Sequence, residues 1–587
     1  MMDINYITQE NQLESLKVLQ DKPYLYLDTE VMIKDFENID FFNDKIRLIQ
    51  IGDEENTFVI DLLKINPEVV KNHIQNLIEN KGIIGHNLKF DLKFLKTNLN
   101  ILPKIVFDTM IASQILAKGD NSQRHSLSAS AKRFVSLDVD KTYQKSPWWA
   151  KDLSPEQIEY AAKDIDALRH LFKEEKNQLN QDNLHKKASG ETFKVFGVIN
   201  PVAALEMAFL PALVEIELSG IPIDEEEAKK LLKQKELEFQ ADYMKFKIKT
   251  GADPFSPLQV VNYLTNKLKI KLPKTEKGSF SSQDVFLKDY EDIEEVRLLL
   301  KLRADKKIID KIKEILQFTR NKRVYGEFKQ IGAATGRMSS LRPNLQNIPK
   351  NLKYLFKPKE GYKFIVADYS QIELRIAAQY TKDENMITAF NEGKDLHKLT
   401  ASIITGKSYD EITKEERQLA KAINFGLIYG MSPKSLIEYA KANYGVSINL
   451  QEAKKFHENY FKFYKSFKDW HDRVKEHLDK HRFTTLETLL GRKLIAYKFT
   501  DAVNYPIQGS GSDLLKMAVV FFFKERNDLD AKVVNLVHDE ILVEVAANDI
   551  EKAKEVLSSS MEKAGKLILK DVPVAFEMVV SDSWSKE

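Results

Sequence analysis

Two aspartates at the tips of apolar strand segments constrain this chain more than any other feature. The run Lys363–Ala367 predicts a buried strand, and Asp368 ends it. Two β-branched runs within Val533–Val545 predict a hairpin whose turn holds His538 and Asp539. Either aspartate alone would be an ordinary turn residue, but two carboxylates brought together repel each other unless cations bridge them. The pair therefore indicates a divalent metal site.

A predicted helix between these two elements carries a cationic and aromatic stripe. Residues spaced by four drift by about 40° per step around a helix, so they share one broad side. The stripe consists of Arg417, Lys421, Phe425 and Tyr429. Two cations on consecutive turns suit a triphosphate, and a neighbouring ring suits a base. An amphipathic helix would explain the cations alone, whereas the stripe and the aspartates together favour metal-assisted nucleotidyl transfer on a nucleic-acid template.

Four more carboxylates lie near the N-terminus. Asp28 and Glu30 follow the predicted strand Tyr24–Leu27, and at a period of two they point to the same face. Asp91 and Asp164 lie on predicted helices. Four such groups could converge on two metals roughly 4 Å apart, a spacing that clamps both oxygens of an in-line phosphoryl displacement. Oxygen ligands favour Mg²⁺ or Mn²⁺.

Length and composition bound the alternatives. A chain of 587 residues predicts roughly three to five compact units. We expect an α/β region over residues 1–190, long amphipathic helices over 201–325, strands again from 326, and mostly helices over 383–490. The lack of cysteine excludes disulfides and thiolate metal sites. The sequence has no run of about 18 apolar residues, so we expect no membrane span.

The net charge of the whole chain is close to zero, but one segment is strongly basic. A net charge of +2 neither supports nor excludes nucleic-acid binding. Residues 301–323 hold nine basic and three acidic residues, a local balance of +6. Such a segment would attract a phosphate backbone, or it would be an ordinary solvated helix face.

The N-terminal strings resemble the proofreading 3′–5′ exonucleases of the DEDD superfamily, in the subtype that contains a tyrosine. Their order across about 140 residues carries the resemblance, because each string alone would be surface charge. An RNase H-like domain over residues 1–190 is implied. By the resemblance, Tyr160 orients the attacking water, and the metals are held by Asp28, Glu30, Asp91 and Asp164.

The rest of the chain resembles the family A DNA polymerases of the polymerase I type. The strings that carry this are Ala420–Ser432, Thr335–Ser340, Pro343–Pro349 and Asn504–Gly509. The implied shape is a right-hand polymerase domain over residues 191–587. Its parts would be a thumb (about 200–325), a palm (about 326–380 and 500–587) and fingers (about 381–499). The chain begins almost at the exonuclease strand, so we expect no 5′ nuclease domain.

The resemblance also implies a role for each matching residue. Asp368, Asp539 and the backbone carbonyl of Tyr369 would bind two catalytic metals. The incoming nucleotide would be contacted by Arg417, Lys421, Phe425, Tyr429, Glu373 and His397. The primer–template would be contacted by Arg337, Asn504, Gln508 and His538. Among these, Lys421 and Arg417 would act in catalysis on the phosphates, and Glu373 would exclude a ribose 2′-OH.

The expected activity is template-directed addition of dNTPs to a primer 3′ end, with 3′–5′ proofreading, in DNA replication or repair. Each active site would use two Mg²⁺ or Mn²⁺ ions. The expected partners are primer–template DNA and dNTPs, with no membrane. We expect a monomer inside a cell: a bacterial cytoplasm, a phage-infected cell or a plastid.

Three other interpretations stay open at this point. A stand-alone exonuclease of RNase D type would explain residues 1–190 but leaves Asp368, Asp539 and Lys421 without a role. A single-subunit RNA polymerase shares the palm layout, although Glu373 and Phe425 speak against it. A non-catalytic accessory clamp would not need carboxylates at both sites.

Overall fold

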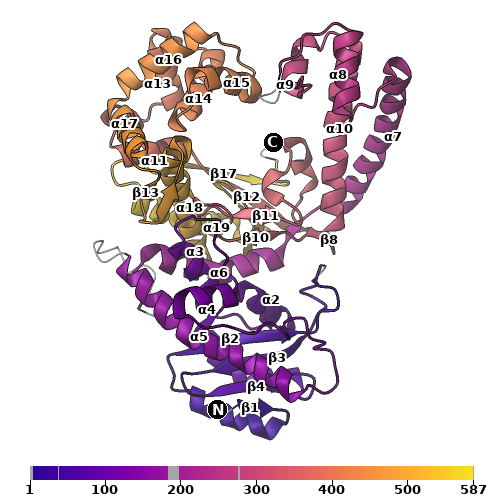
Figure 1. The fold of residues 1–587 in the computed structure, drawn as a ribbon, viewed down its shortest axis with the longest axis vertical. Helices are drawn as coiled ribbons and strands as arrows, with labels where there is room; N and C mark the ends of the chain where they lie inside the picture. Colours follow the sequence, from indigo (N-terminus) through magenta and orange to yellow (C-terminus); the bar gives the residue numbers. More distant parts are fainter. Residues whose placement is uncertain (1–3, 38, 183–196, 275–277, 586–587) are drawn as a thin grey trace.

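The molecule has a lower α/β domain and an upper domain with two helical arms (Figure 1). The structure is a computed structural model that describes residues 4–37, 39–182, 197–274 and 278–585. The predicted boundary near residue 190 lies outside these described residues.

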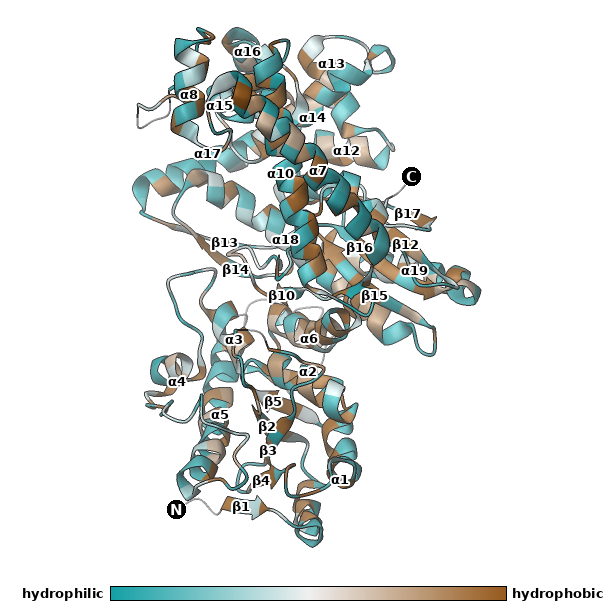
Figure 2. Cartoon of the chain, turned by 90° about the vertical axis from the view of Figure 1, so that its right-hand side faces the viewer, coloured by the Kyte–Doolittle hydropathy of each residue, from teal (hydrophilic) through white to brown (hydrophobic). Residues whose placement is uncertain are grey.

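The lower domain is a six-stranded mixed sheet with helices around it. Its strand order is β1-β4-β3-β2-β5-β6, with β3 antiparallel to both of its neighbours, β2 and β4. The apolar strands are the brown centre of this domain in Figure 2. The strands are β1 (Ile4–Ile7), β2 (Tyr24–Val31), β3 (Ile46–Gly52), β4 (Thr57–Asp61), β5 (Gly82–Gly85) and β6 (Ile105–Asp108). The helices are η1 (Glu10–Leu19), α1 (Pro67–Asn80), α2 (Leu88–Leu99), α3 (Thr109–Leu116), α4 (Leu127–Val135) and α5 (Pro155–Gln181).

The strand that carries the first two carboxylates is longer than predicted. We expected Asp28 and Glu30 to follow a strand that ends at Leu27, but β2 runs on to Val31. The extension forms because β3 pairs with it throughout, with Asp28 opposite Gln50. Both carboxylates therefore lie on a paired strand, where their direction is fixed.

The upper domain is built on an antiparallel sheet of order β15-β16-β12-β17. Its strands are β12 (Tyr362–Tyr369), β15 (Ala531–Val537), β16 (Glu540–Ala546) and β17 (Phe576–Ser581). The helix α19 (Ile550–Ile568) packs against β12 and β16, and α18 (Phe499–Glu525) packs against α19. The predicted hairpin is confirmed. The strand predicted to end before Asp368 instead continues to Tyr369, because β16 and β17 both pair with Asp368.

Two helical arms rise on either side of this sheet (Figure 1). One contains α7 (Glu225–Thr250), α8 (Pro257–Asn266), α9 (Asp284–Leu287), η2 (Lys288–Tyr290) and α10 (Glu294–Gln317). The other contains α12 (Glu384–Asn391), α13 (Leu396–Thr405), η5 (Tyr409–Glu411), α14 (Lys414–Ile428), α15 (Pro433–Tyr444), α16 (Leu450–Phe463) and α17 (Lys465–Lys480). Lys441 Nζ of α15 lies 2.6 Å from Asp289 Oδ2 of η2, so the tips of the arms touch.

Shorter elements link the sheet to the arms. The strands are β7 (Ile221–Pro222), β8 (Thr319–Arg320), β9 (Arg323–Val324), β10 (Glu327–Lys329), β11 (Ser339–Leu341), β13 (Thr484–Glu487) and β14 (Lys493–Ala496). The helices are η3 (Leu345–Asn347), η4 (Lys350–Leu355), α11 (Ile372–Thr381) and η6 (Ala547–Asp549).

The helix α6 (Pro201–Ser219) joins the two domains. It is apolar on nearly all sides, which is typical of a helix buried all round. Phe209 belongs to the core of the upper domain, whereas Met207 belongs to the core of the lower one. Two buried glutamates on α6 hold cations from both domains. Glu206 accepts from Lys516 (2.7 Å), and Glu217 accepts from Lys93 (2.9 Å).

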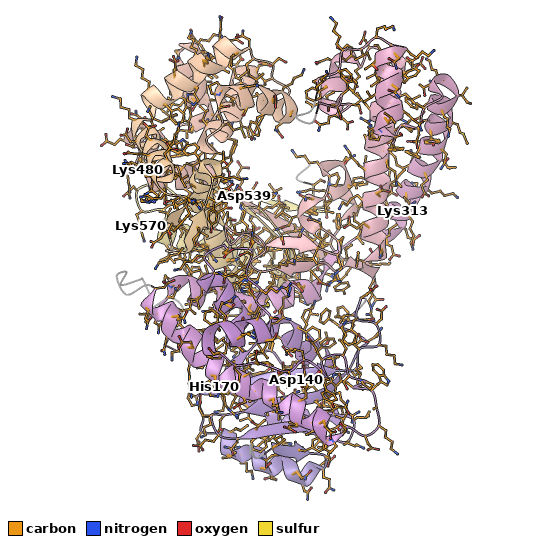
Figure 3. The ribbon with its side chains drawn as sticks, in the orientation of Figure 1. Asp140, His170, Lys313, Lys480, Asp539 and Lys570 are labelled. Atoms are coloured by element: carbon orange, nitrogen blue, oxygen red, sulfur yellow. The ribbon has the colours of Figure 1, made fainter. Side chains whose placement is uncertain are left out.

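Most cations of the basic segment over residues 301–323 form ion pairs. Lys313 (Figure 3) pairs with Glu236 at 2.7 Å, and Arg320 pairs with Asp40 at 2.7 Å. Six more of the nine cations form ion pairs: Lys301, Arg303, Lys306, Lys307, Lys311 and Arg323. Eight of the nine cations therefore have an acidic partner, and some of these pairs join the arm to α7 and neighbouring elements. The side chains of Lys306, Lys307 and Lys313 nevertheless stay 46%, 75% and 54% exposed.

Candidate active sites

The predicted carboxylates of the lower domain come together. Oxygens of Asp28, Glu30 and Asp164 all lie within 4.8 Å of one another. The first two come from β2 and the third from α5, so three fixed carboxylates converge from two elements.

Asp91 is placed beside this group by its neighbours. It accepts a hydrogen bond from Thr29 Oγ1 at 2.6 Å, and Thr29 lies between the two carboxylates of β2. The start of its helix is held by Asp108, whose carboxylate accepts from the N–H groups of Asn87 (3.0 Å) and Leu88 (2.8 Å). Asp108 thus positions α2.

Burial and mutual repulsion disfavour the charged forms of these carboxylates. Burial, followed by the neighbouring carboxylates, raises the pKa of Asp28 and of Glu30 well above the usual range. Burial raises the pKa of Asp91 to about 7 and also raises that of Asp164. Such a cluster is costly without cations, so it is suited to bind them.

The four carboxylates and Tyr160 line one cavity of about 660 Å³. Tyr160 lies on α5, one turn before Asp164, and its side chain is largely buried. Within the described part of the chain, Asp164 Oδ1 is buried and has no hydrogen-bond partner. Its nearest cation is Lys141 Nζ, at 3.6 Å. A set of converging carboxylate oxygens fits hard divalent cations such as Mg²⁺.

The upper domain brings its two predicted aspartates to neighbouring strands. Asp539 lies in the β15–β16 turn, where His538 adopts a positive φ of 55°. Tyr369 N–H donates to the backbone oxygen of Asp539 at 3.3 Å, which fixes the turn against the end of β12. Burial and then Asp368 raise the pKa of Asp539 to about 7. This pair also fits a divalent cation.

The cationic stripe of α14 faces these aspartates. One cavity of about 350 Å³ is lined by both aspartates and by Arg417, Lys421, Phe425, Tyr369, Glu373 and His397. His397 Nδ1 is bonded to Asn424 Nδ2 at 2.9 Å, and its ring lies 5.7 Å from that of Phe425. Burial lowers the pKa of His397 to about 4, so its imidazole is neutral at pH 7.

Tyr429 and Arg337 do not line the cavity, but both donate hydrogen bonds to Glu373, which does. The helix ends at Ile428, and the Tyr429 hydroxyl donates to one Glu373 oxygen while Arg337 donates to the other. Both partners fix the direction of the Glu373 carboxylate beside the aspartates.

The other predicted DNA-contacting residues lie outside this cavity. Asn504 and Gln508 are one turn apart on α18, and Gln508 lies beside Tyr429. Within the described residues, Asn504 Oδ1 is buried without a hydrogen-bond partner. His538 is exposed.

Sequence reasoning missed three polar residues. Asp395 accepts two hydrogen bonds from Arg417, at 2.9 and 2.6 Å, and its place before a predicted helix start was the available signal. Glu577 lies opposite Asp368 on β17 and lines the same cavity. Lys141 lines the lower cavity. The last two carry no motif, so only the fold reveals them.

The fold and the two sites define a polymerase that carries a nuclease domain. Residues 4–180 match the 3′–5′ exonuclease family, and residues 224–586 match DNA polymerase family A. The chain is 49% identical over its full length to the whole of DNA polymerase I from Aquifex aeolicus. It is 31% identical to DNA polymerase I from Borreliella burgdorferi, covering all of this chain and 66% of that protein.

The chain therefore belongs to DNA polymerase family A, and it carries a 3′–5′ exonuclease domain. Its fold also matches the polymerase domain of Pol1 from M. smegmatis, solved with DNA primer–template and dNTP, with a TM-score of 0.83, 23% identity and 99% coverage of both chains. The predicted family and domain order are confirmed, and the stand-alone nuclease and accessory clamp are excluded. Domains of both kinds depend on metal ions. Within the residues that the structure describes, no helix is long and apolar enough to cross a bilayer.

Proposed function

We propose that the chain adds dNTPs to the 3′ end of a primer on a DNA template, at the cavity between the sheet and α14. The observation that carries this is the single cavity in which two strand-borne aspartates face two cations and a phenylalanine. Such a cavity matches a nucleotide, with anionic phosphates at one end and a flat base at the other.

Each residue would act on one part of the substrate. Asp368, Asp539 and the Tyr369 carbonyl would hold two Mg²⁺ ions, which would neutralise the phosphates and lower the pKa of the primer 3′-OH. Arg417 and Lys421 would bind the triphosphate. We propose Lys421 as the group that gives a proton to the leaving pyrophosphate.

Base and sugar would be checked on the other side of the cavity. Phe425 would stack at the base, with His397 behind it, and Tyr429 would shape the pocket. Glu373, fixed by Arg337 and Tyr429, would exclude a 2′-OH. Arg337, Asn504, Gln508 and His538 would contact the primer–template, where the minor groove reports base-pair shape more than sequence.

The lower cavity would remove mismatched 3′ ends. Asp28, Glu30, Asp91 and Asp164 would hold two Mg²⁺ ions, and Tyr160 would orient the attacking water. We propose that the thumb, palm and fingers have the bounds expected from the sequence, and that the chain works as a monomer inside the cell.

The experiment is extension of a 5′-labelled primer on a DNA template with Mg²⁺, supplied with dNTPs or rNTPs, and in parallel without nucleotides. We expect extension with dNTPs, little with rNTPs, and shortening without nucleotides. Efficient rNTP extension would favour the RNA polymerase interpretation, and the absence of shortening would contradict proofreading.

A further inference from the structure

Lys141 is the only lysine or arginine among the described residues that line the nuclease cavity. Its Nζ lies 3.6 Å from Asp164 Oδ1 and 5.9 Å from the centre of the Tyr160 ring. The same lining contains two histidines, but burial lowers the pKa of His86 to about 3 and also lowers that of His125. At neutral pH, Lys141 is therefore the one cation among the described lining residues.

The loop that carries Lys141 is held against the site. Asp140 (Figure 3) accepts hydrogen bonds from the Thr142 N–H at 2.9 Å and from the Thr142 hydroxyl, which forms a local turn. The ring of Tyr143 lies 5.9 Å from that of Tyr160. The Lys141 side chain is 29% exposed, so it reaches the cavity and can still meet a DNA strand that enters it.

Charge balance gives this cation a task. Two divalent ions would just neutralise the four carboxylates that line the cavity, which would leave no positive charge over for the substrate. A phosphodiester brings one negative charge, and attack by hydroxide adds another to its non-bridging oxygens. A group that stabilises this developing charge speeds the reaction more than one that binds the ground state.

We propose that Lys141 is a further catalytic residue of the nuclease, with its ammonium group bound to a non-bridging oxygen of the scissile phosphate. This inference rests on the nuclease function proposed above. In the reaction, the water oxygen forms a bond to the phosphorus of the terminal nucleotide, and the bond from that phosphorus to the 3′ oxygen of the preceding nucleotide breaks. The water loses a proton to solvent, and the leaving 3′ oxygen takes one from solvent. Lys141 forms no covalent bond and transfers no proton.

The rival explanation is that Lys141 only pairs with Asp164 and keeps the carboxylates apart. The two explanations differ in their effect on metal binding. A cation that merely occupies the carboxylate cluster competes with metals, so its removal would strengthen metal binding and leave hydrolysis unharmed. A cation on the phosphate is needed after the metals are bound, so its removal would slow hydrolysis without weakening the metals.

The test uses three variants of the full chain. Lys141→Met removes the charge and keeps the length of the side chain, and Lys141→Arg keeps the charge. Lys163→Met is the matched control, because Lys163 Nζ pairs with Glu159 at 2.7 Å on the outside of α5. For each variant we would measure single-turnover removal of the terminal nucleotide from single-stranded DNA, and primer extension as a check of folding. Mn²⁺ affinity would be measured by electron paramagnetic resonance in an Asp539→Ala background, so that the nuclease site dominates binding.

We expect Lys141→Met to slow removal about a hundredfold, as for loss of one transition-state donor. The rate of removal in Lys141→Arg should stay within about tenfold of the parental rate, and the rate in Lys163→Met should equal the parental rate. Extension should be unchanged, and Mn²⁺ should bind Lys141→Met at least as tightly as the parent. Removal within about threefold of the parent, an equal loss in Lys141→Arg, or a loss of Mn²⁺ affinity that accounts for the slower removal would each overturn the inference.

Asp28→Ala separates the failure of this inference from that of the proposed function. If Asp28→Ala abolishes removal and Lys141→Met does not, only the role of Lys141 is wrong. If Asp28→Ala leaves removal intact, the nuclease function itself fails.

Discussion

The two catalytic centres are assembled in different ways. All four nuclease carboxylates come from elements of one domain, and three of them meet within 4.8 Å. The polymerase centre takes its aspartates from the sheet and its cations from α14 in an arm above the sheet. The nuclease centre is thus complete within its own fold, whereas the polymerase centre depends on where the arm lies.

The centres also differ in charge. The nuclease cavity opposes four carboxylates with the one ammonium group of Lys141 among its described lining residues. The polymerase cavity sets Arg417 and Lys421 against its carboxylates, and the Arg417 guanidinium is already fixed by Asp395. The first cavity would therefore hold metals and leave one ammonium group for the substrate, whereas the second would hold metals and offer two cations to an anionic nucleotide.

The largest expected effect falls on the polymerase centre. Asp539→Ala should lower the rate of nucleotide addition by about a thousandfold or more, because the remaining carboxylate cannot hold two metals. Single-nucleotide insertion kinetics would measure this, with Asp582→Ala as a control for loss of an exposed aspartate. Insertion within about tenfold of the parent would contradict the assignment of Asp539 to the metals.

Loss of the carboxylates of the nuclease centre should lower primer shortening and leave extension intact. Asp28→Ala combined with Glu30→Ala should reduce shortening of a mismatched primer by about a thousandfold, since both carboxylates face the same cavity. Extension of a matched primer should be nearly intact. A comparable loss of extension would show that the two centres are not independent.

A smaller effect concerns the sugar. Glu373→Ala should raise incorporation of rNTPs by about tenfold to a hundredfold and lower the overall rate somewhat, because it opens the place next to Phe425. Insertion kinetics for dNTP and rNTP on parent and variant would measure it. Phe425→Tyr should raise use of dideoxynucleotides, as the added hydroxyl replaces the missing 3′-OH. Unchanged rNTP discrimination in Glu373→Ala would assign the exclusion to another residue.

The metal dependence of stability should vary with pH. The pKa of Asp91 is about 7 in the fold and 3.8 without it, so in the absence of metal the fold loses stability as pH rises through this interval. Metals bind the ionised form, so the increase in Tm on adding Mg²⁺ should be larger at pH 8 than at pH 6. Calorimetry of the Asp539→Ala variant would show this for the nuclease centre, and a smaller increase at pH 8 would contradict it.

The smallest effect on activity should come from the helix between the domains. Glu217 is buried and accepts from Lys89 (2.6 Å), Lys93 (2.9 Å) and the Phe328 N–H (2.8 Å). Glu217→Gln leaves the buried Lys93 and the partly buried Lys89 underpaired and should cost about 2 kcal/mol of stability, while both activities persist. Chemical denaturation would measure the loss, with exposed Glu226→Gln as the control.

The sequence predicted the elements that carry motifs and could not predict how they meet. The hairpin around Asp539 and the helix from Arg417 follow from local patterns, and the structure has both. The extent of β2 beyond Leu27 depends on pairing with β3, which is a long-range contact. The same holds for Glu577, whose place beside Asp368 is set by strand order. Two partners of the basic segment, Asp242 and Glu236 on α7, are likewise distant in sequence, so the sequence alone could not show how its charge is paired.

One labelled primer with a mismatched 3′ end would show whether the two centres act independently. Shortening without nucleotides and extension with dNTPs would be followed for the parent, for Asp539→Ala, and for Asp28→Ala combined with Glu30→Ala. We expect Asp539→Ala to shorten the primer at the parental rate without lengthening it. The nuclease variant should not shorten this primer, and it should extend a second primer with a matched 3′ end at the parental rate. A single substitution that lowers both rates to a similar degree would contradict two separate centres.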